Sequence, residues 1–200
     1  MSTARELVSS KTKGPIDTSV QLRFLDAKIS ATKDPRRKRN LEIVREHLYY
    51  ECKIDLPGIM RTLAPNAKYK FWADGEDAGP KGNDAILEWY KGFARSRALV
   101  LIYELDHVVA DDDCVVTEGQ MNAVVDAAYA MNFFGKKYDP SDMLVHSFRM
   151  IIFWPFDASG GLVGEEIYVN GQTRPEAWRK LEPHEVPEQW NTMVKVSQET

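Results

Sequence analysis

The stretch "EHLYYECKIDLPGIMRTLAPNAKYKFW", residues 46–72, decides the fold, because two helices and a strand follow one another within it. Asp55 comes just before Pro57 and Gly58, and it is a competent N-cap for a short second helix. Residues 67–74 alternate as a strand does. The first helix covers about residues 36–54. Its apolar stripe consists of Leu41, Val44, Leu48 and Cys52, and the spacing of three and four between them continues to Asp55. The helical phase therefore places Asp55 on the apolar face.

The segments on either side complete an α+β pattern. A helix over residues 17–33 comes before this stretch, and a helix from Asn83 or Asp84 to Arg95 follows it. From Arg97 onward the pattern changes to strands, with one hairpin within residues 98–130 and a second within residues 143–169. Helices followed by antiparallel strands indicate helices packed on one face of a curved sheet.

The pattern also divides the chain into three parts. Residues 1–16 are polar, contain Gly14-Pro15, and are predicted to be a flexible arm. Residues 17–181 form a single domain, which ends in a short helix over residues 176–181. Residues 182–200 read as a polar C-terminal tail.

Composition excludes several classes of function. The 200 residues are 44% hydrophobic, which is enough for one sizeable core, and the net charge of -4 gives no general reason to expect nucleic-acid binding. No apolar run is long enough to cross a membrane, and the N-terminus has no apolar signal core. Cys52 and Cys114 form no disulfide framework, so we expect a cytoplasmic protein.

Sequence motifs give no support for a cofactor or a metal. No glycine-rich phosphate loop, dinucleotide fingerprint or nucleophile elbow occurs in the chain. The four histidines are scattered and show no metal-ligand spacing. We therefore expect acid–base chemistry by carboxylate, histidine and tyrosine side chains, with no cofactor and no metal.

Four segments together resemble the NTF2-like superfamily, in its SnoaL-like branch. They are "EHLYYECKIDLPGIMRTLAPNAKYKFW", "GPKGNDAILEWYKGF", "DHVVADDDCVVTEG" and "GEEIYVN", and they span about residues 46–170. The resemblance implies a cone, in which a bent antiparallel sheet wraps around a long helix and leaves a pocket. It also implies a homodimer formed through the outer face of the sheet. The superfamily includes ketosteroid isomerase, scytalone dehydratase, polyketide cyclases and non-enzymatic transport factors, so the fold does not fix the function.

The resemblance suggests Asp55 as a catalytic residue. In the dehydratase branch, an acidic residue at the end of this helix supports a catalytic histidine, and Asp55 matches the acidic position. The family's histidine lies near residues 98–101, where this chain has none, and His146 is the candidate replacement. Asp55 therefore has two interpretations: a helix cap worth about 1 kcal/mol, or a buried base with a raised pKa.

The strand at residues 143–156 carries two further catalytic candidates on opposite faces. His146 shares one face with Leu144, Phe148 and other apolar residues, and it is either a hydrogen-bonded core residue or a pocket residue. Arg149 lies on the other face and needs a partner, which Glu118 can supply. If that second face is the concave one, Arg149 is the pocket residue and His146 points toward the dimer surface.

The remaining candidates are substrate-binding residues. Glu118 and Asn122 share one strand face, which is either solvent-facing or lines the cavity. One of Tyr49 and Tyr50 on the long helix can donate a hydrogen bond to a developing oxyanion. Aromatic side chains predict a hydrophobic, aromatic or polycyclic ligand, and those selected as substrate-binding are Trp72, Trp89 and Tyr168.

These observations predict a cofactor-independent lyase, dehydratase or isomerase that acts on a hydrophobic small molecule. Asp55 or His146 would take a proton, and a tyrosine, Arg149 or Asn122 would stabilise the negative charge. An epoxide hydrolase is an alternative enzyme and needs Arg149 between two carboxylates. A non-catalytic binding or scaffold protein is the alternative outside enzymes. An enzyme should hold at least two convergent titratable groups in an enclosed pocket.

Overall fold

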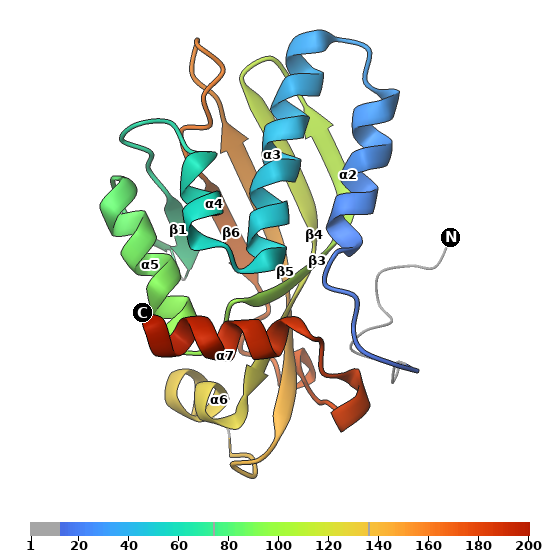
Figure 1. The fold of residues 1–200 in the computed structure, drawn as a ribbon, viewed down its shortest axis with the longest axis vertical. Coiled ribbons are helices and arrows are strands. Elements are labelled where there is room, and N and C mark those ends of the chain that lie inside the picture. Colours follow the sequence, from blue (N-terminus) through green and yellow to red (C-terminus); the bar gives the residue numbers. More distant parts are fainter. Residues whose placement is uncertain (1–12, 74, 136) are drawn as a thin grey trace.

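The computed structural model describes residues 13–73, 75–135 and 137–200, which form a mixed α+β fold (Figure 1). Six α-helices lie within these residues: α2 (Val20–Ala31), α3 (Pro35–Lys53), α4 (Leu56–Arg61), α5 (Asn83–Arg95), α6 (Ala127–Phe134) and α7 (Gln189–Glu199). The strands are β1 (Lys70–Ala73), β2 (Glu76–Asp77), β3 (Val100–Ala110), β4 (Cys114–Asp126), β5 (Met143–Pro155), β6 (Glu166–Asn170) and β7 (Trp178–Lys180). Two single-turn 3-10 helices cover Pro175–Ala177 and Pro183–Glu185. None of the helices in the described ranges has the length and apolarity needed to span a membrane.

The strands form one curved sheet that does not close. Their order is β2-β1-β6-β5-β4-β3, and β7 pairs with the start of β5. All neighbours are antiparallel except β1 and β6, which run parallel. The α+β prediction is therefore confirmed, with α2, α3 and α4 lying in front of the sheet (Figure 1).

Helix α3 packs its apolar stripe against the sheet, as the spacing predicts. Leu41, Val44 and Leu48 are almost completely buried, and α3 contacts β3 and β4. Asp34 caps the helix by accepting hydrogen bonds from the backbone N–H groups of Arg36 and Arg37. Fully burying such side chains stabilises the fold by about 1.5–3 kcal/mol each, so this stripe anchors the helix in the cone.

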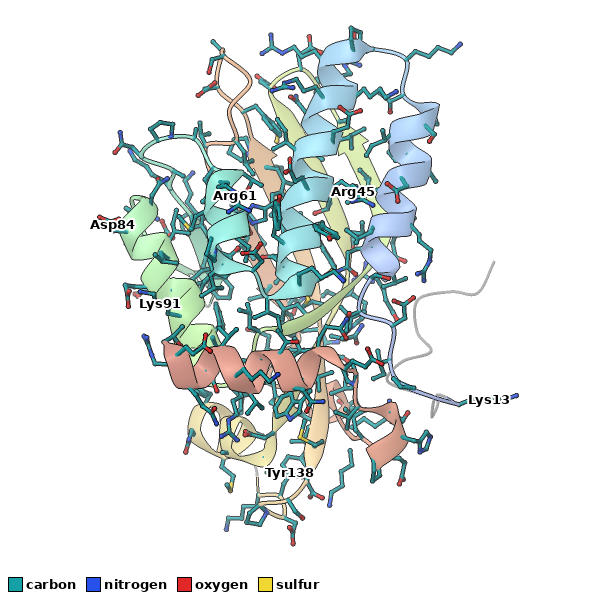
Figure 2. The ribbon with its side chains drawn as sticks, viewed as in Figure 1. Lys13, Arg45, Arg61, Asp84, Lys91 and Tyr138 are labelled. Atoms are coloured by element: carbon teal, nitrogen blue, oxygen red, sulfur yellow. The ribbon has the colours of Figure 1, made fainter. Side chains whose placement is uncertain are left out.

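Helix α5 is strongly amphipathic and lies at one edge of the sheet. Ile86, Tyr90 and Ala94 are buried at helical spacing. Asp84 and Lys91 project from the opposite side into solvent (Figure 2). Tyr90 is thereby fixed in the interior, where it becomes part of the candidate site.

The two faces of β5 settle which side of the sheet is concave. Phe148, Met150 and Ile152 are buried toward the helices, whereas Ile151 and Phe153 are 37% and 39% exposed on the outer face. The alternation along the strand is the predicted one. His146 belongs to the inner row and Arg149 to the outer row.

Two segments of the predicted domain differ from their sequence-based predictions. Residues 127–134 form helix α6, because Asp126 caps them by accepting a hydrogen bond from the backbone N–H of Tyr129. Residues 178–180 form strand β7 in place of a helix, because they pair with the start of β5. Gly135, with φ 61°, ends α6 in the left-handed conformation that glycine adopts easily.

The C-terminal residues are part of the packed domain and not a tail. Met193 of α7 is fully buried, and α7 contacts α5, α3 and β3. Glu185 is also fully buried and pairs with Arg179 at 2.8 Å. Residues 1–12 of the predicted arm lie outside the described residues. Ile16 is 4% exposed, and its backbone N–H donates to the carbonyl of Glu185.

Candidate active site

A cavity of about 410 Å³ lies between the helices and the concave face of the sheet. Its volume is in the range typical of small-molecule pockets. Residues from α3, α5, α6 and strands β1, β3, β4, β5 and β6 contribute to the wall. The aromatic members of the wall are Phe71, Trp89, Tyr90, Phe93, Tyr129, Phe133, Phe134 and Phe148. Such a surface suits a hydrophobic ligand.

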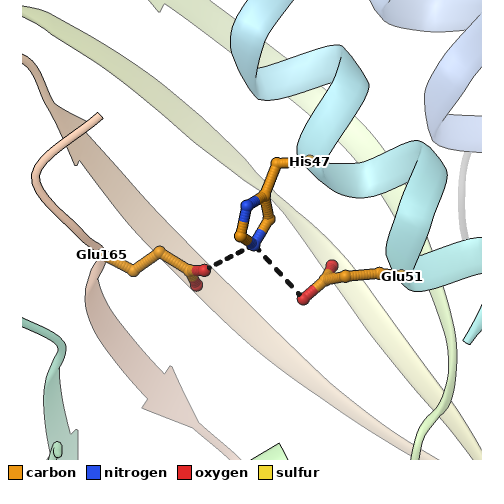
Figure 3. Close-up of side chains that lie close together, drawn as sticks. All are labelled: His47, Glu51 and Glu165. Atoms are coloured by element: carbon orange, nitrogen blue, oxygen red, sulfur yellow. Dashed lines mark ion pairs between the residues drawn. The ribbon is translucent and has the colours of Figure 1, made fainter. Parts of the chain in front are cut away.

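Two carboxylates at one end are the charged groups of this wall. Glu51 comes from the last turn of α3, and Glu165 comes from the residue just before β6. His47 lies one helical turn before Glu51 and between the two carboxylates (Figure 3). Its Nε2 atom is 3.1 Å from Glu165 Oε1 and 3.9 Å from Glu51 Oε1. The three side chains therefore form one titratable cluster, which we call the His–Glu cluster.

The Thr62 hydroxyl fixes the tautomer of His47. Thr62 Oγ1 donates to the carbonyl of Ile59 at 2.6 Å, so its single proton is used. His47 Nδ1 lies 2.6 Å from the same oxygen and must donate to it. The Nε2 atom, which faces the carboxylates, is therefore the position that gains or loses a proton.

Two buried tyrosines complete the hydrogen bonding of the cluster. The Tyr90 hydroxyl donates to Glu51 Oε1 at 2.8 Å and lies 3.2 Å from His47 Nε2. The Tyr69 hydroxyl lies 3.3 Å from both His47 Nε2 and the Tyr90 hydroxyl. Burial and the nearby carboxylates raise the pKa of both tyrosines well above the ordinary value. Both hydroxyls therefore stay protonated and act as hydrogen-bond donors.

Burial gives Glu51 a pKa suited to proton transfer. Burial raises the pKa of Glu51 to about 7; the charge of Glu165 adds to the rise, while His47 and Tyr90 oppose it. Burial alone would lower the pKa of His47, but the hydrogen bond and charge of Glu165 outweigh it and raise that pKa. His47 is thus held as a cation beside Glu165, and Glu51 is left to exchange protons near neutral pH.

Gly164 allows the chain to place Glu165 at this position. Its φ of +139° is one that L side chains rarely adopt. A Cβ at this position would lie 2.0 Å from the carbonyl oxygen of Lys68. The backbone of Lys70 then donates to the carbonyl of Glu165 at 2.7 Å, which joins β1 to the start of β6. This close approach orients the Glu165 side chain toward the interior.

Asp55 and Tyr50 lie on the outer side of the α3–α4 junction and do not line the cavity. Asp55 Oδ1 accepts a hydrogen bond from the Gly58 backbone at 2.9 Å, as an N-cap does. Its Oδ2 lies 3.8 Å from Arg61, and the side chain is 39% exposed. The Tyr50 ring lies under the Arg61 guanidinium at 5.3 Å; Arg61 is labelled on α4 in Figure 2. The capping role of Asp55 is therefore present, and its position gives no support to the catalytic role.

His146 lies on the concave side but is absent from the cavity wall. Its ring stacks on Trp178 with centroids 3.9 Å apart, and Phe134 and Phe148 lie on its other sides. Its Nε2 atom contacts the backbone carbonyl of Gln172 at 2.9 Å. This arrangement is that of a hydrogen-bonded core histidine.

Arg149 and Glu118 pair with each other on the convex face. Arg149 also contacts Asp106 at 2.6 Å, so it does lie between two carboxylates. The arginine side chain is 43% exposed, and neither partner lines the cavity. Asn122 is buried and accepts a hydrogen bond from the Ser147 hydroxyl at 2.5 Å. The predicted polar set is therefore assembled outside the cavity.

The three aromatic candidates divide between the two faces. Trp89 lines the cavity and packs against Phe93 with centroids 4.7 Å apart. Trp72 and Tyr168 stack on each other at 6.1 Å on the convex face, where Tyr168 is 40% exposed. Among the residues selected from the sequence, Trp89 is thus the one that contributes to the cavity wall.

The sequence-based prediction passed over the three residues of the His–Glu cluster. His47 and Glu51 are four residues apart on α3 and lie beside the apolar stripe through Val44 and Leu48, and this spacing was available as a signal. Glu165 alternates with Glu166 and so faces the opposite side of the sheet.

The cluster is also the group most suited to hold a metal ion. Within the described ranges, His47, Glu51 and Glu165 are the group whose ligand atoms all lie within 4.8 Å of one another. One imidazole and two carboxylates are common ligands of divalent transition metals. Any test of proton transfer at this site therefore needs a metal-free arm.

Comparisons with known proteins identify the fold. No protein-family model matches the chain, and no curated protein matches its sequence. A candidate SnoaL-like polyketide cyclase from Shewanella putrefaciens aligns with a TM-score of 0.58 at 12% identity, covering 83% of this chain and 96% of that one. A second from a Jannaschia species gives 0.55 at 12% identity, covering 72% and 98%. An NTF2-like protein of unknown function from Burkholderia pseudomallei gives 0.50 at 17% identity, covering 66% and 91%. The chain therefore has the NTF2-like cone fold found in SnoaL-like proteins.

Proposed function

We propose that this protein is a cofactor-independent enzyme that transfers protons on a hydrophobic small molecule, as a lyase, dehydratase or isomerase does. One observation carries the proposal: the Glu51 carboxyl lies in the wall of an aromatic cavity and is backed by the His47–Glu165 pair. Two convergent titratable groups in an enclosed pocket are what distinguishes an enzyme from a scaffold of the same fold. A non-catalytic binding protein remains the alternative.

In this proposal Glu51 is the general base. Its carboxylate takes a proton from a substrate carbon next to a carbonyl, and the C–H electron pair moves into the conjugated system as an enolate. The His47 cation, 3.9 Å from Glu51, and the Tyr90 hydroxyl offset the negative charge that develops. An isomerase would return the proton to another atom, whereas a dehydratase would use it to protonate the departing hydroxyl.

The structural neighbours support small-molecule chemistry in this cavity. Two of the neighbours named above are described as candidate SnoaL-like polyketide cyclases. A further structural neighbour is described as a candidate hydroxylase from Streptomyces galilaeus. For this chain we propose an aromatic or polycyclic substrate, because eight aromatic side chains line its cavity. The epoxide-hydrolase alternative has less support, since Arg149 and its two carboxylates lie on the convex face.

Proton abstraction from nitrobenzisoxazole tests the proposal without knowledge of the natural substrate. This flat, uncharged probe loses one C–H proton to a base, its N–O bond breaks, and a coloured cyanophenolate forms. We expect saturable turnover by the wild-type protein, unchanged after EDTA treatment. A rate equal to that of free acetate at the same concentration would overturn the proposal, and a rate lost in EDTA would point to a metal-dependent site.

We also propose that the protein forms a homodimer through the convex face of the sheet. This face exposes apolar surface from Ile151, Phe153 and Tyr168. Two ion pairs flank this surface, Arg149 with Asp106 and Lys70 with Glu166. Phe153→Glu should convert a dimer to a monomer in sedimentation equilibrium, because it places charges against the facing copy. A wild-type protein that sediments as a monomer would contradict this proposal.

A further inference from the structure

The cavity has two chemically different ends, because it follows strand β5. Behind the wall at one end, the rings of Trp154 and His47 pack with centroids 5.5 Å apart. Behind the wall at the other end, the ring of His146 packs on Phe134 of α6 with centroids 4.8 Å apart. The wall residues of β5 between them run from Phe148 to Ile152, a distance of about 13 Å at the usual rise of a strand. A ligand that fills the cavity therefore reaches from the His–Glu cluster to α6.

Two polar side chains at the α6 end form no hydrogen bond through their polar groups to another described residue. Tyr129 lines the cavity, and burial raises its pKa, but its hydroxyl makes no hydrogen bond to another described residue. Gln172 lines the same end; its backbone carbonyl contacts His146, while its side-chain amide has no partner among the described residues. A half-buried hydroxyl and an amide without partners are available to a polar group of a ligand.

The charge of the wall discriminates against anions. No lysine or arginine is among the described residues that line the cavity, and the charged ones are Glu51 and Glu165. With His47 as a cation, the cluster is neutral or carries one negative charge, depending on the proton of Glu51. A carboxylate or phosphate placed in this aromatic cavity would lose its hydration without gaining a counter-ion.

We propose that the cavity takes an uncharged ligand with a polar group at each end, and that Tyr129 determines specificity by binding the group farther from Glu51. The ligand class is thus a hydroxy- or oxo-substituted aromatic molecule that carries no acidic group. This inference deepens the proposed function, and it rests on that function for the assignment of the reacting end of the ligand to Glu51.

Three naphthalene probes separate the two parts of the proposal in calorimetric titrations. 6-Hydroxy-2-naphthamide has two neutral polar ends, 2-naphthamide has one, and 6-hydroxy-2-naphthoate is the anionic counterpart of the first. We expect 6-hydroxy-2-naphthamide to bind about 3- to 10-fold more tightly than 2-naphthamide, the worth of one hydrogen bond. We expect it to bind at least about 10-fold more tightly than the naphthoate, a difference that Glu51→Gln should reduce.

Tyr129→Phe should remove the advantage of 6-hydroxy-2-naphthamide over 2-naphthamide. Tyr138→Phe is the matched control, because Tyr138 lies near Lys180 and outside the cavity wall. The inference is overturned if the naphthoate binds as tightly as the amide, if Tyr129→Phe leaves the ratio of the two amides unchanged, or if 6-hydroxy-2-naphthamide shows no saturable binding. Binding of the amides without any deprotonation of nitrobenzisoxazole would contradict the proposed function and leave this inference standing.

Discussion

Glu51→Gln is expected to slow proton abstraction from nitrobenzisoxazole by at least about 100-fold, the usual contribution of a positioned general base. Glutamine keeps the shape of the side chain and can still accept the hydrogen bond from Tyr90, but it cannot take a proton. The wild-type rate should rise with pH through about 7, because Glu51 must be deprotonated to act as the base. Stopped-flow absorbance across this pH range measures both effects.

The Asp55→Asn variant tests whether the catalytic base is Glu51, as the structure indicates, or Asp55, as the sequence suggests. Asparagine is also a good N-cap, and Asp55 lies outside the cavity, so the variant should keep the wild-type rate. Asp55 would be the catalytic base if the folded Glu51→Gln variant kept the wild-type rate and the Asp55→Asn variant were inactive. Circular dichroism of both variants checks that the fold is retained.

Glu165→Ala should lower the free energy of unfolding by about 3–5 kcal/mol, because it removes the nearer of the two carboxylates that face the buried His47 charge. Glu165 is 4% exposed and contacts His47 Nε2 at 3.1 Å, while His47 is fully buried. Removing the carboxylate also leaves the Tyr90 hydroxyl without one of its neighbours. Urea denaturation at neutral pH measures the change.

Glu166→Ala is the matched control one residue along the chain. Glu166 pairs with Lys70 at 2.8 Å on the partly exposed outer face, and such a pair contributes about 1 kcal/mol or less. Glu165→Ala and Glu166→Ala remove the same carboxylate from opposite faces of the sheet, the first from the interior and the second from the outer face. Equal losses of stability would contradict the account of His47 and Glu165 as a buried charged pair.

Much of the fold was predictable because local signals agree with the tertiary structure. The stripe through Leu41, Val44 and Leu48 predicted α3, and the alternation along residues 143–155 predicted which β5 side chains share a face. Helix α6 and strand β7 were missed for opposite reasons. Asp126 starts a helix directly at the end of a strand, and β7 is a strand only because it pairs with β5.

The site was less predictable because it depends on which sheet face is concave. Period-two alternation puts Glu165 and Glu166 on opposite faces but does not say which face meets the helices. The sequence-based candidates were therefore drawn from both faces: Arg149 and Tyr168 lie on the convex face, whereas His146 lies on the concave face. His47 was passed over although Glu51 follows it by one helical turn, because the sequence does not show that Glu165, 118 positions away (165 − 47), completes the cluster.

Titration of the Glu51 carboxyl by carbon NMR tests the central claim most directly. The side-chain carboxyl carbons of labelled glutamates are followed with pH, and the signal missing from Glu51→Gln is assigned to Glu51. The account predicts that this carboxyl titrates with a pKa of about 7, since burial beside Glu165 disfavours its charged form. A Glu51 carboxyl that titrates near 4.5, the ordinary value, would contradict the claim that it exchanges protons at neutral pH.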